Sequence, residues 1–153
     1  GQGRREACMI GLVRNIRTNE PQAIHRTAID RNARKIGRKS FGPVAGGAIK
    51  LSDDAEVTTA VAIGEGIEST LSIQHLPGLR TMPVWSLLSA GGVASFPALS
   101  GIESVWIAAD NDEGGKGQGA ALEAADRLDG AHIEVVVLTT TIPDTDLNDW
   151  RAA

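Results

Sequence analysis

The chain has 153 residues and a formal net charge of -4, with 42% hydrophobic and 22% charged residues, as is typical of a globular domain. No apolar stretch is long enough to cross a bilayer and no secretory signal opens the chain, so we expect no membrane partner and a cytoplasmic location. Cys8 is the only cysteine, which excludes internal disulfides and cysteine zinc sites. Because the chain lacks an initiating Met, we expect a piece of a longer protein.

Charge is divided unevenly along the chain. Residues 1–50 contain eleven Lys or Arg and three acidic residues, a net charge of +8, whereas residues 51–153 contain four basic and sixteen acidic residues, a net charge of -12. A basic segment predicts a polyanionic partner, and an acidic segment predicts metal cations. The alternative is that both segments are solvated surfaces that attract each other.

The N-terminal part of the chain predicts strands. Residues 7–16 are mainly apolar, a TNEP turn signal follows, and residues 22–30 alternate between apolar and polar side chains, so a hairpin is expected. Residues 31–47 are basic and rich in glycine, and we expect irregular structure there, followed by a short strand at 48–51. Together these segments predict a small β-rich basic lobe at residues 1–57 that contains no helix.

From residue 58 onward, short strands alternate with helices. Strands are expected at 61–65, 83–88, 104–110 and 132–139, helices at 67–76 and 117–130, and a glycine-rich turn or a single helical turn at 89–96. This alternation predicts an α/β fold with a parallel sheet flanked by helices on both faces. Ligands of such sheets bind at the carboxyl ends of the strands.

Acidic side chains follow three of these strands. They are Glu65 and Glu68 after the first, Asp110 and Asp112 after the third, and Asp146 and Asp149, with Asn148 between them, after the fourth. The topology would bring all three clusters to one edge of the sheet. Mg²⁺ and Mn²⁺ prefer oxygen ligands and are held by a few carboxylates together with waters and substrate phosphates. A bound cation would also neutralise the mutual repulsion of the carboxylates.

Each cluster alone also has an ordinary structural explanation. Glu68 could be a first-turn residue stabilised by the helix dipole, and Asp146 could be a helix N-cap. A DxD sequence after a strand also occurs in phosphatases, glycosyltransferases and receiver domains. A receiver or phosphatase fold would need an aspartate after the first strand, where this chain has Glu65. Three clusters in this order are more specific than any one of them.

Three segments together resemble the motifs of a Toprim domain: VAIGEGIESTLS, VWIAADNDEGGKGQGAA and TDLNDW. This is the metal-binding catalytic fold of bacterial-type primases, type IA and II topoisomerases and some nucleases. The resemblance covers about residues 58–153, which we therefore expect to be a Toprim catalytic domain. The GEGIES and DNDEGG forms are most similar to primase-type Toprim domains of phage and mobile-element proteins, and residues 24–51 are similar to the region that precedes the domain there.

The resemblance implies catalytic roles for three residues. Glu65 stands at the position of the family's first-motif glutamate, which acts as an acid/base or a metal ligand, and Asp110 and Asp112 stand at the DxD metal ligands. Glu68 occupies a position where primases usually have an aspartate.

The third motif departs from the primase pattern. Asp146 and Asn148 stand where primases have a pair of acids, so the implied metal ligands are Glu65, Glu68, Asp110, Asp112, Asp146 and Asn148. Asn148 is a weaker, neutral ligand, for which Asp149 could compensate. Thr145 stands where a lysine often precedes the acid.

A primase-type Toprim domain implies Mg²⁺-dependent or Mn²⁺-dependent synthesis of RNA primers from nucleoside triphosphates on single-stranded DNA. It also implies a larger replication protein with zinc-binding, helicase or relaxase domains. The chain has no tyrosine, which excludes cleavage through a covalent phosphotyrosine of its own. Expected contacts to nucleic-acid phosphates come from Arg26, Arg31, Arg34, Lys35, Arg38, Lys39 and Lys116. Lys116 could equally be a solvated lysine at the start of a helix.

Two alternatives remain open from the sequence. A Toprim nuclease would use the same metals to nick nucleic acid without nucleotides. The other alternative is a nucleic-acid-binding module with degenerate catalysis. Its best support is that Asn148 and Thr145 depart from the primase pattern.

Overall fold

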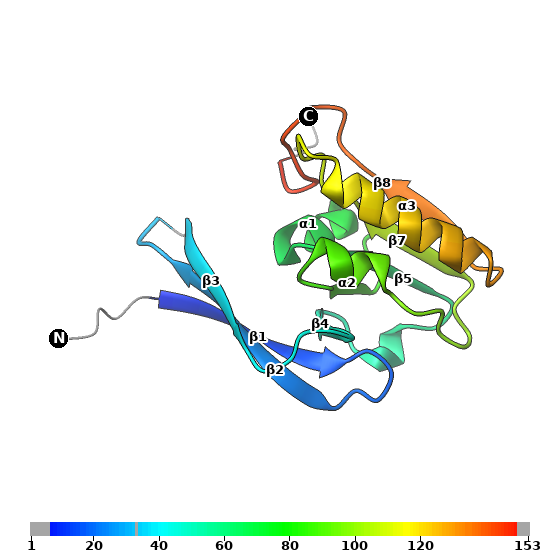
Figure 1. Ribbon diagram of the computed structural model, residues 1–153, viewed down its shortest axis with the longest axis horizontal. Helices are drawn as coiled ribbons and strands as arrows, with labels where there is room; N and C mark the ends of the chain where they lie inside the picture. The colour runs from blue at the N-terminus through cyan, green and yellow to red at the C-terminus, as the bar shows by residue number, and fades with distance from the viewer. Residues whose placement is uncertain (1–6, 33, 150–153) are drawn as a thin grey trace.

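An eight-stranded mixed sheet runs through the residues that the structure describes, 7–32 and 34–149 (Figure 1). In this computed structural model the strands lie in the order β3-β2-β1-β4-β6-β5-β7-β8. Their bounds are β1 Ala7–Asn15, β2 Pro21–Ile29, β3 Lys35–Phe41, β4 Gly47–Lys50, β5 Ala60–Gly64, β6 Val84–Ser86, β7 Ser104–Ala108 and β8 Glu134–Leu138. The sheet, with parallel strands in its core and helices against it, confirms the predicted α/β class.

Three antiparallel strands form the N-terminal end of the sheet. β1 pairs with β2 as the sequence predicts, and β2 also pairs with β3, where Ile24 lies opposite Phe41 and Thr27 opposite Arg38. The prediction of irregular structure over residues 31–47 is therefore wrong where β3 forms. β3 is an edge strand that is exposed over nearly its whole length, so both of its faces can carry polar and cationic side chains. The apolar alternation that marks a half-buried strand is consequently missing.

β4 joins the two ends of the sheet, because it pairs antiparallel with both β1 and β6. Lys50 at the end of β4 has a side chain that is only 5% exposed, and its Nζ atom lies 2.6 Å from Oδ1 of Asp54. The same ammonium group lies 4.5 Å from the centroid of the Trp85 ring. The predicted lobe at 1–57 and the segment at 58–153 thus share one sheet. Their division into two domains stays a prediction.

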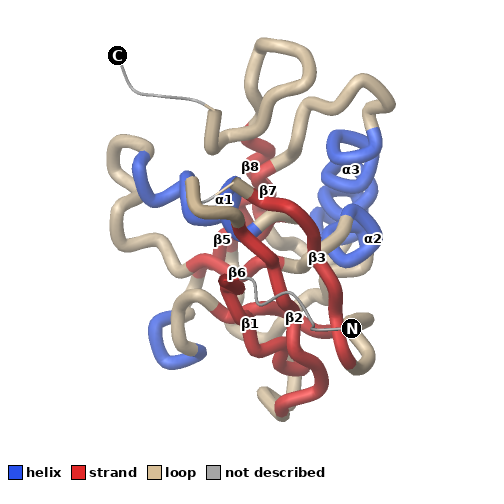
Figure 2. Tube along the Cα trace, turned by 90° about the vertical axis from the view of Figure 1, so that its left-hand side faces the viewer, coloured by secondary structure: helices blue, strands red, loops and turns tan. Residues whose placement is uncertain are grey.

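Helices cover both faces of the parallel half of the sheet (Figure 2). On one face lies α1 (Ile67–Ser72), which continues into the 3-10 turn η2 (Ile73–His75), and on the other α2 (Ala90–Ala94) packs against α3 (Lys116–Asp129). α2 is the helical turn that the sequence offered as one of two alternatives. A further 3-10 turn, η1 (Asp54–Glu56), connects β4 to β5. Across the described ranges, no helix has the length and apolar character needed to span a membrane.

Alternate residues of β5 face the two helical layers, as the period of a strand requires. Val61 and Ile63 are fully buried in the larger core beneath α2 and α3, whereas Ala62 is fully buried in the smaller core on the side of α1. Gly64 ends β5, and a Cβ there would lie 2.5 Å from Oγ1 of Thr70 on α1. The absence of a side chain at Gly64 therefore lets α1 begin immediately beyond the strand.

The carboxyl ends of β5, β7 and β8 lie next to one another. β7 stands between β5 and β8, and it pairs with each in parallel over five residues. Glu65 leaves the end of β5, Asp110 follows β7, and residues 139–149 follow β8. The three acidic clusters therefore converge on one edge, as the sequence predicts. Below, this edge is called the acidic edge.

The space around two glycines of α3 differs, and substitutions at these positions test how closely this helix approaches the acidic edge. A Cβ at Gly117 would lie 2.6 Å from the backbone oxygen of Asp110, whereas a Cβ at Gly119 would meet no atom within 4 Å. We expect Gly117→Ala to lower the free energy of unfolding by about 1–3 kcal/mol, because the backbone must shift. We expect Gly119→Ala to raise it by about 0.5–1 kcal/mol, because alanine favours a helix. Urea denaturation measures both, and equal destabilisation by the two changes would contradict the close approach at Gly117.

Candidate functional site

Glu65 connects β5 to α1 at one end of the acidic edge. Its backbone oxygen accepts a hydrogen bond from the Ser86 hydroxyl, with Oγ 2.9 Å away, which fixes the chain as it leaves the strand. Burial raises the pKa of the Glu65 carboxyl, and the Asp110 carboxylate raises it further, whereas Arg38 and a hydrogen bond from the backbone of Ala90 lower it. Glu65 is thus a partly buried acid that retains its proton more readily than an exposed glutamate does.

Asp110 holds a carboxylate in an unfavourable position. Its Oδ1 atom is buried and has no hydrogen-bond partner within the part of the chain that is described. Burial raises the pKa of Asp110, the carboxylates of Asp146 and Asp112 raise it further, and a hydrogen bond from Ser69 and the charge of Lys35 lower it. A buried carboxylate oxygen without a donor costs free energy, so this position favours a proton or a bound cation.

Asp112 closes the turn between β7 and α3. Its Oδ1 accepts a hydrogen bond from the backbone N–H of Lys116, 2.8 Å away, at the first turn of α3. Gly115, which precedes the helix, has a φ of 62°, a left-handed conformation that glycine adopts without strain. The Asp112 side chain therefore has a structural role at the start of α3 in addition to the metal-binding role that the sequence predicts.

Asp146 is held by α1 and by its own turn. Oδ2 accepts a hydrogen bond from the Ser69 hydroxyl at 2.9 Å, and Oδ1 accepts from the backbone N–H groups of Asn148 at 2.7 Å and Asp149 at 3.2 Å. Ser69 also lowers the pKa of Asp110, so its hydroxyl lies near both carboxylates. Ser69 was not among the predicted site residues, although its position one helical turn beyond Glu65 was a usable signal.

An open cavity of about 260 Å³ lies at the acidic edge. It is lined by Asp110, Asp112, Asp144, Thr145, Asp146 and Asp149. Asn148, a predicted ligand, is exposed and is not part of this lining, whereas Asp149 is. The third motif thus presents Asp146 and Asp149 to the cavity.

A second cavity, of about 240 Å³, lies between the β2–β3 hairpin and α1. Glu65 and Glu68 line it from the α1 side, and His25, Lys35 and Arg38 line it from the hairpin. The Nζ atom of Lys35 lies 2.9 Å from Oε2 of Glu68, so an ion pair joins the two walls. We call this space the hairpin cavity. The Glu68 carboxylate is thereby engaged by a lysine, and it lines the hairpin cavity rather than the cavity at the acidic edge.

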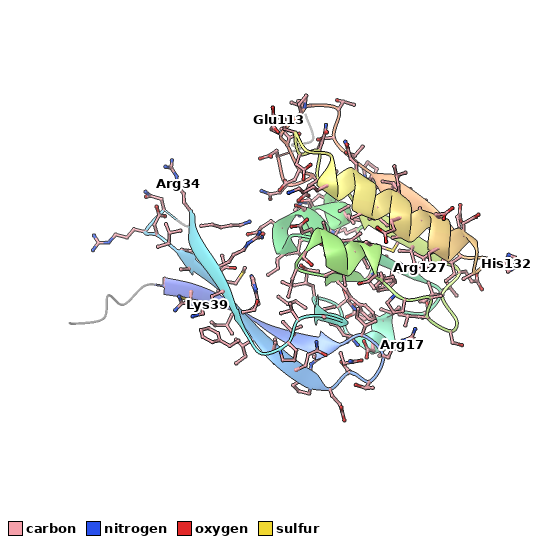
Figure 3. All side chains as sticks on the ribbon, in the orientation of Figure 1. Arg17, Arg34, Lys39, Glu113, Arg127 and His132 are labelled. Carbon is pink, nitrogen blue, oxygen red and sulfur yellow. The ribbon has the colours of Figure 1, made fainter. Side chains whose placement is uncertain are left out.

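The other predicted phosphate-binding residues are spread over different surfaces. Arg26 and Lys39 lie opposite each other on the hairpin, one register position from the pair Thr27–Arg38, so they face away from the hairpin cavity. Arg34 lies near the tip of the hairpin and Lys39 further along β3 (Figure 3). Arg31 is exposed in the same tip, and Lys116 is exposed at the start of α3, outside the linings of both cavities.

Comparison with known proteins gives a family and a fold. The sequence model of the family described as "Toprim domain" matches residues 60–153, more than half of the chain. The primase fragment of the bacteriophage T7 primase-helicase protein has a similar structure, with a TM-score of 0.59 and 17% sequence identity. The similarity covers 94% of this chain but 57% of the T7 chain, so this chain spans little more than half of that fragment. No curated protein sequence matches the chain.

The residues at the acidic edge fit a hard divalent cation that brings further ligands with it. Among the residues described, no group of three or more His, Cys, Asp or Glu side chains is arranged to hold a metal ion by itself. Mg²⁺, however, commonly uses only one or two carboxylates and completes its shell with waters and substrate phosphates. Asp110 offers a buried oxygen without a donor, with Asp112 and Asp146 close enough to raise its pKa. The edge therefore offers the oxygen ligands that a divalent cation prefers.

Replacement of Asp110 tests its unfavourable environment. Since the pKa of Asp110 is raised in the folded protein, its ionised form destabilises the fold above its ordinary pKa of about 4, and this penalty disappears as the pH falls. We expect Asp110→Asn to raise the free energy of unfolding at pH 7, without added metal, by about 1 kcal/mol. The gain should shrink as the pH is lowered toward 4, as urea denaturation across this range will show.

Asp126→Asn is the control, because Asp126 is an exposed acid on α3 that lines neither cavity. We expect little change in stability from it at either pH. If Asp110→Asn lowered the free energy of unfolding at pH 7, or raised it equally at pH 7 and pH 4, the Asp110 carboxylate would not be in an unfavourable environment.

Proposed function

The chain belongs to the Toprim family, and we propose that it is a primase-type member that joins ribonucleotides into primers on single-stranded DNA. The proposed cofactor is Mg²⁺ or Mn²⁺. We also propose that the chain is part of a larger replication protein. The observation that carries the proposal is the buried, unpartnered oxygen of Asp110 beside Asp112 and Asp146. Toprim domains generally bind divalent metal ions, which agrees with this carboxylate set.

The metal would be held by Asp110 together with Asp112 or Asp146, with Asp149 at the rim of the same cavity. Bound there, it would neutralise the charge of a triphosphate and lower the pKa of the attacking hydroxyl. Ser69 and the backbone N–H groups that bind Asp146 hold that carboxylate in place before substrate arrives. The protein therefore supplies a fixed set of oxygen ligands.

Glu65 is suited to move the proton. Its raised pKa brings the carboxyl closer to neutral pH, which is favourable for a general base, and it borders both the Asp110 carboxylate and the hairpin cavity. In the proposed reaction Glu65 accepts the proton of the 3′ hydroxyl as that oxygen forms its bond to the α-phosphorus. Pyrophosphate leaves with the electron pair of the broken P–O bond.

The hairpin cavity supplies positive charge for the phosphates that leave. Lys35 and Arg38 line it beside Glu65, and the Lys35–Glu68 ion pair keeps the lysine directed toward α1. A triphosphate that bound here would exchange the single carboxylate partner of Lys35 for several phosphate oxygens.

The opposite face of the hairpin is suited to the template. Arg26 and Lys39 lie across from one another there, and the neighbouring pair Ile24 and Phe41 is 45% and 51% exposed. Lys39 lies over the Phe41 ring, 5.1 Å from its centroid. Unpaired bases have apolar faces that can cover such side chains while the cations contact phosphates, whereas the base faces of a duplex are stacked on one another. We propose that single-stranded DNA binds on this face.

Primer synthesis tests the function. The chain is given single-stranded DNA, nucleoside triphosphates, a short annealed RNA primer to bypass initiation, and Mg²⁺ or Mn²⁺. We expect extension by the wild type and a loss of about 100-fold or more in Asp110→Asn and in Asp112→Asn, because several kcal/mol of charge stabilisation are removed. Asp126→Asn, at an exposed acid on α3, is the control and should retain full activity.

Three results would contradict the proposal. Equal primer extension by the wild type and the three variants would show that Asp110 and Asp112 do not have the proposed catalytic roles. Cleavage of circular single-stranded DNA without nucleotides would identify a Toprim nuclease. Binding of DNA without extension or metal binding would identify a module with degenerate catalysis.

A further inference from the structure

Asn111 lies between the two aspartates of the DxD motif, and its side chain is fully engaged. The amide Nδ2 donates to the backbone oxygens of Thr140 at 3.1 Å and Ile142 at 3.0 Å. The amide oxygen accepts from Nε2 of Gln118 at 2.7 Å. Both donor hydrogens and one acceptor site are therefore used.

The backbone of Asn111 extends the same connection. Its N–H donates to the carbonyl of Thr145 at 3.1 Å, and its carbonyl accepts from the N–H of Asp144 at 2.7 Å, which forms an isolated antiparallel bridge. Five hydrogen bonds thus converge on Asn111, and four of them come from the loop after β8, residues 139–146. That loop ends at Asp146.

We propose that Asn111 is a positioning residue that sets where Asp146 stands relative to Asp110 and Asp112. The inference rests on the proposed metal-binding function. Asp110 and Asp146 line the same cavity, and like charges this close repel each other when no cation lies between them. The bonds of Asn111 oppose that repulsion, so the ligands are already near one another when the metal binds.

The amide group is specifically required. A carboxylate at this position would direct an oxygen at two carbonyl oxygens, and it would add another negative charge beside Asp110 and Asp112. An alanine would remove one donor from each of the Thr140 and Ile142 carbonyls, and only hydroxyl donors from within the same loop would remain. A neutral side chain with two donors and one acceptor satisfies every partner and adds no charge.

Calorimetric titration with Mn²⁺ tests the proposal. We expect Asn111→Ala to raise the dissociation constant for Mn²⁺ by about tenfold or more, as is usual when a residue that orients metal ligands is removed. Asn15→Ala is the matched control. Asn15 also makes three side-chain hydrogen bonds, to Arg17, Thr18 and Gln22, but in the turn after β1. This control should bind Mn²⁺ as the wild type does.

Asn111→Asp separates positioning from charge. If Asn111 acted as a metal ligand, or if only the number of negative charges mattered, the added carboxylate would tighten Mn²⁺ binding. A positioning role predicts that Asn111→Asp binds Mn²⁺ more weakly than the wild type does, although aspartate adds a negative charge and has almost the same shape as asparagine. The circular dichroism spectrum of each variant shows whether the fold is retained, and Asn111→Asp gives the decisive result if Asn111→Ala does not fold.

Amide hydrogen exchange without metal provides a second readout. The Asp144 N–H, which bonds to the Asn111 carbonyl, should exchange faster in both Asn111 variants and at the wild-type rate in Asn15→Ala. Wild-type protein that bound no Mn²⁺ would overturn the proposed metal site, and the positioning role with it. Wild-type protein that bound Mn²⁺ with the same affinity as Asn111→Ala and Asn111→Asp would overturn the positioning role alone.

Discussion

Repulsion between carboxylates that the sheet forces together is the constraint on which the rest of this structure depends. Three parallel strands deliver Glu65, Asp110 and Asp146 to one edge, and one oxygen of Asp110 is buried there without a donor. Asp110 destabilises the ionised form of Glu65, and Asp146 destabilises that of Asp110. The fold tolerates this cost because the strands, paired over five residues each, hold the chain ends in place. The same feature that weakens the fold makes the edge attractive to a divalent cation.

Neutral groups around the edge keep it assembled in the absence of that cation. Ser69 donates to Asp146 from α1, Asn111 binds the loop after β8, and Gly117 lets α3 approach the backbone of Asp110. On the other side of α1, Lys35 reaches from the hairpin to Glu68 and supplies a positive charge. The continuous sheet through β4 holds the hairpin opposite α1, so the basic and acidic halves of the chain face each other across a cavity.

The sequence was sufficient for the features that follow from strand periodicity and residue type. The order of strands and helices after residue 58, the α/β class and the common edge of the acidic clusters all follow from alternation and topology. β3 could not be predicted, because an exposed edge strand with cations on both faces has no apolar period. The contacts of Ser69 and Asn111 depend on segments 77 and 29 or more residues away, and the Lys35–Glu68 pair depends on how the hairpin folds over α1. Trp150, at the end of the third motif, lies outside the described residues.

The central claim is that the unpartnered oxygen of Asp110 is a ligand for a divalent cation. Diffraction from crystals soaked in Mn²⁺, recorded where manganese scatters anomalously, tests it most directly. We expect an anomalous peak at a coordination distance of about 2.1 Å from Oδ1 of Asp110, with Asp112 or Asp146 in the same shell. A peak elsewhere on the protein, or no peak while Oδ1 of Asp110 stays without a partner, would contradict it.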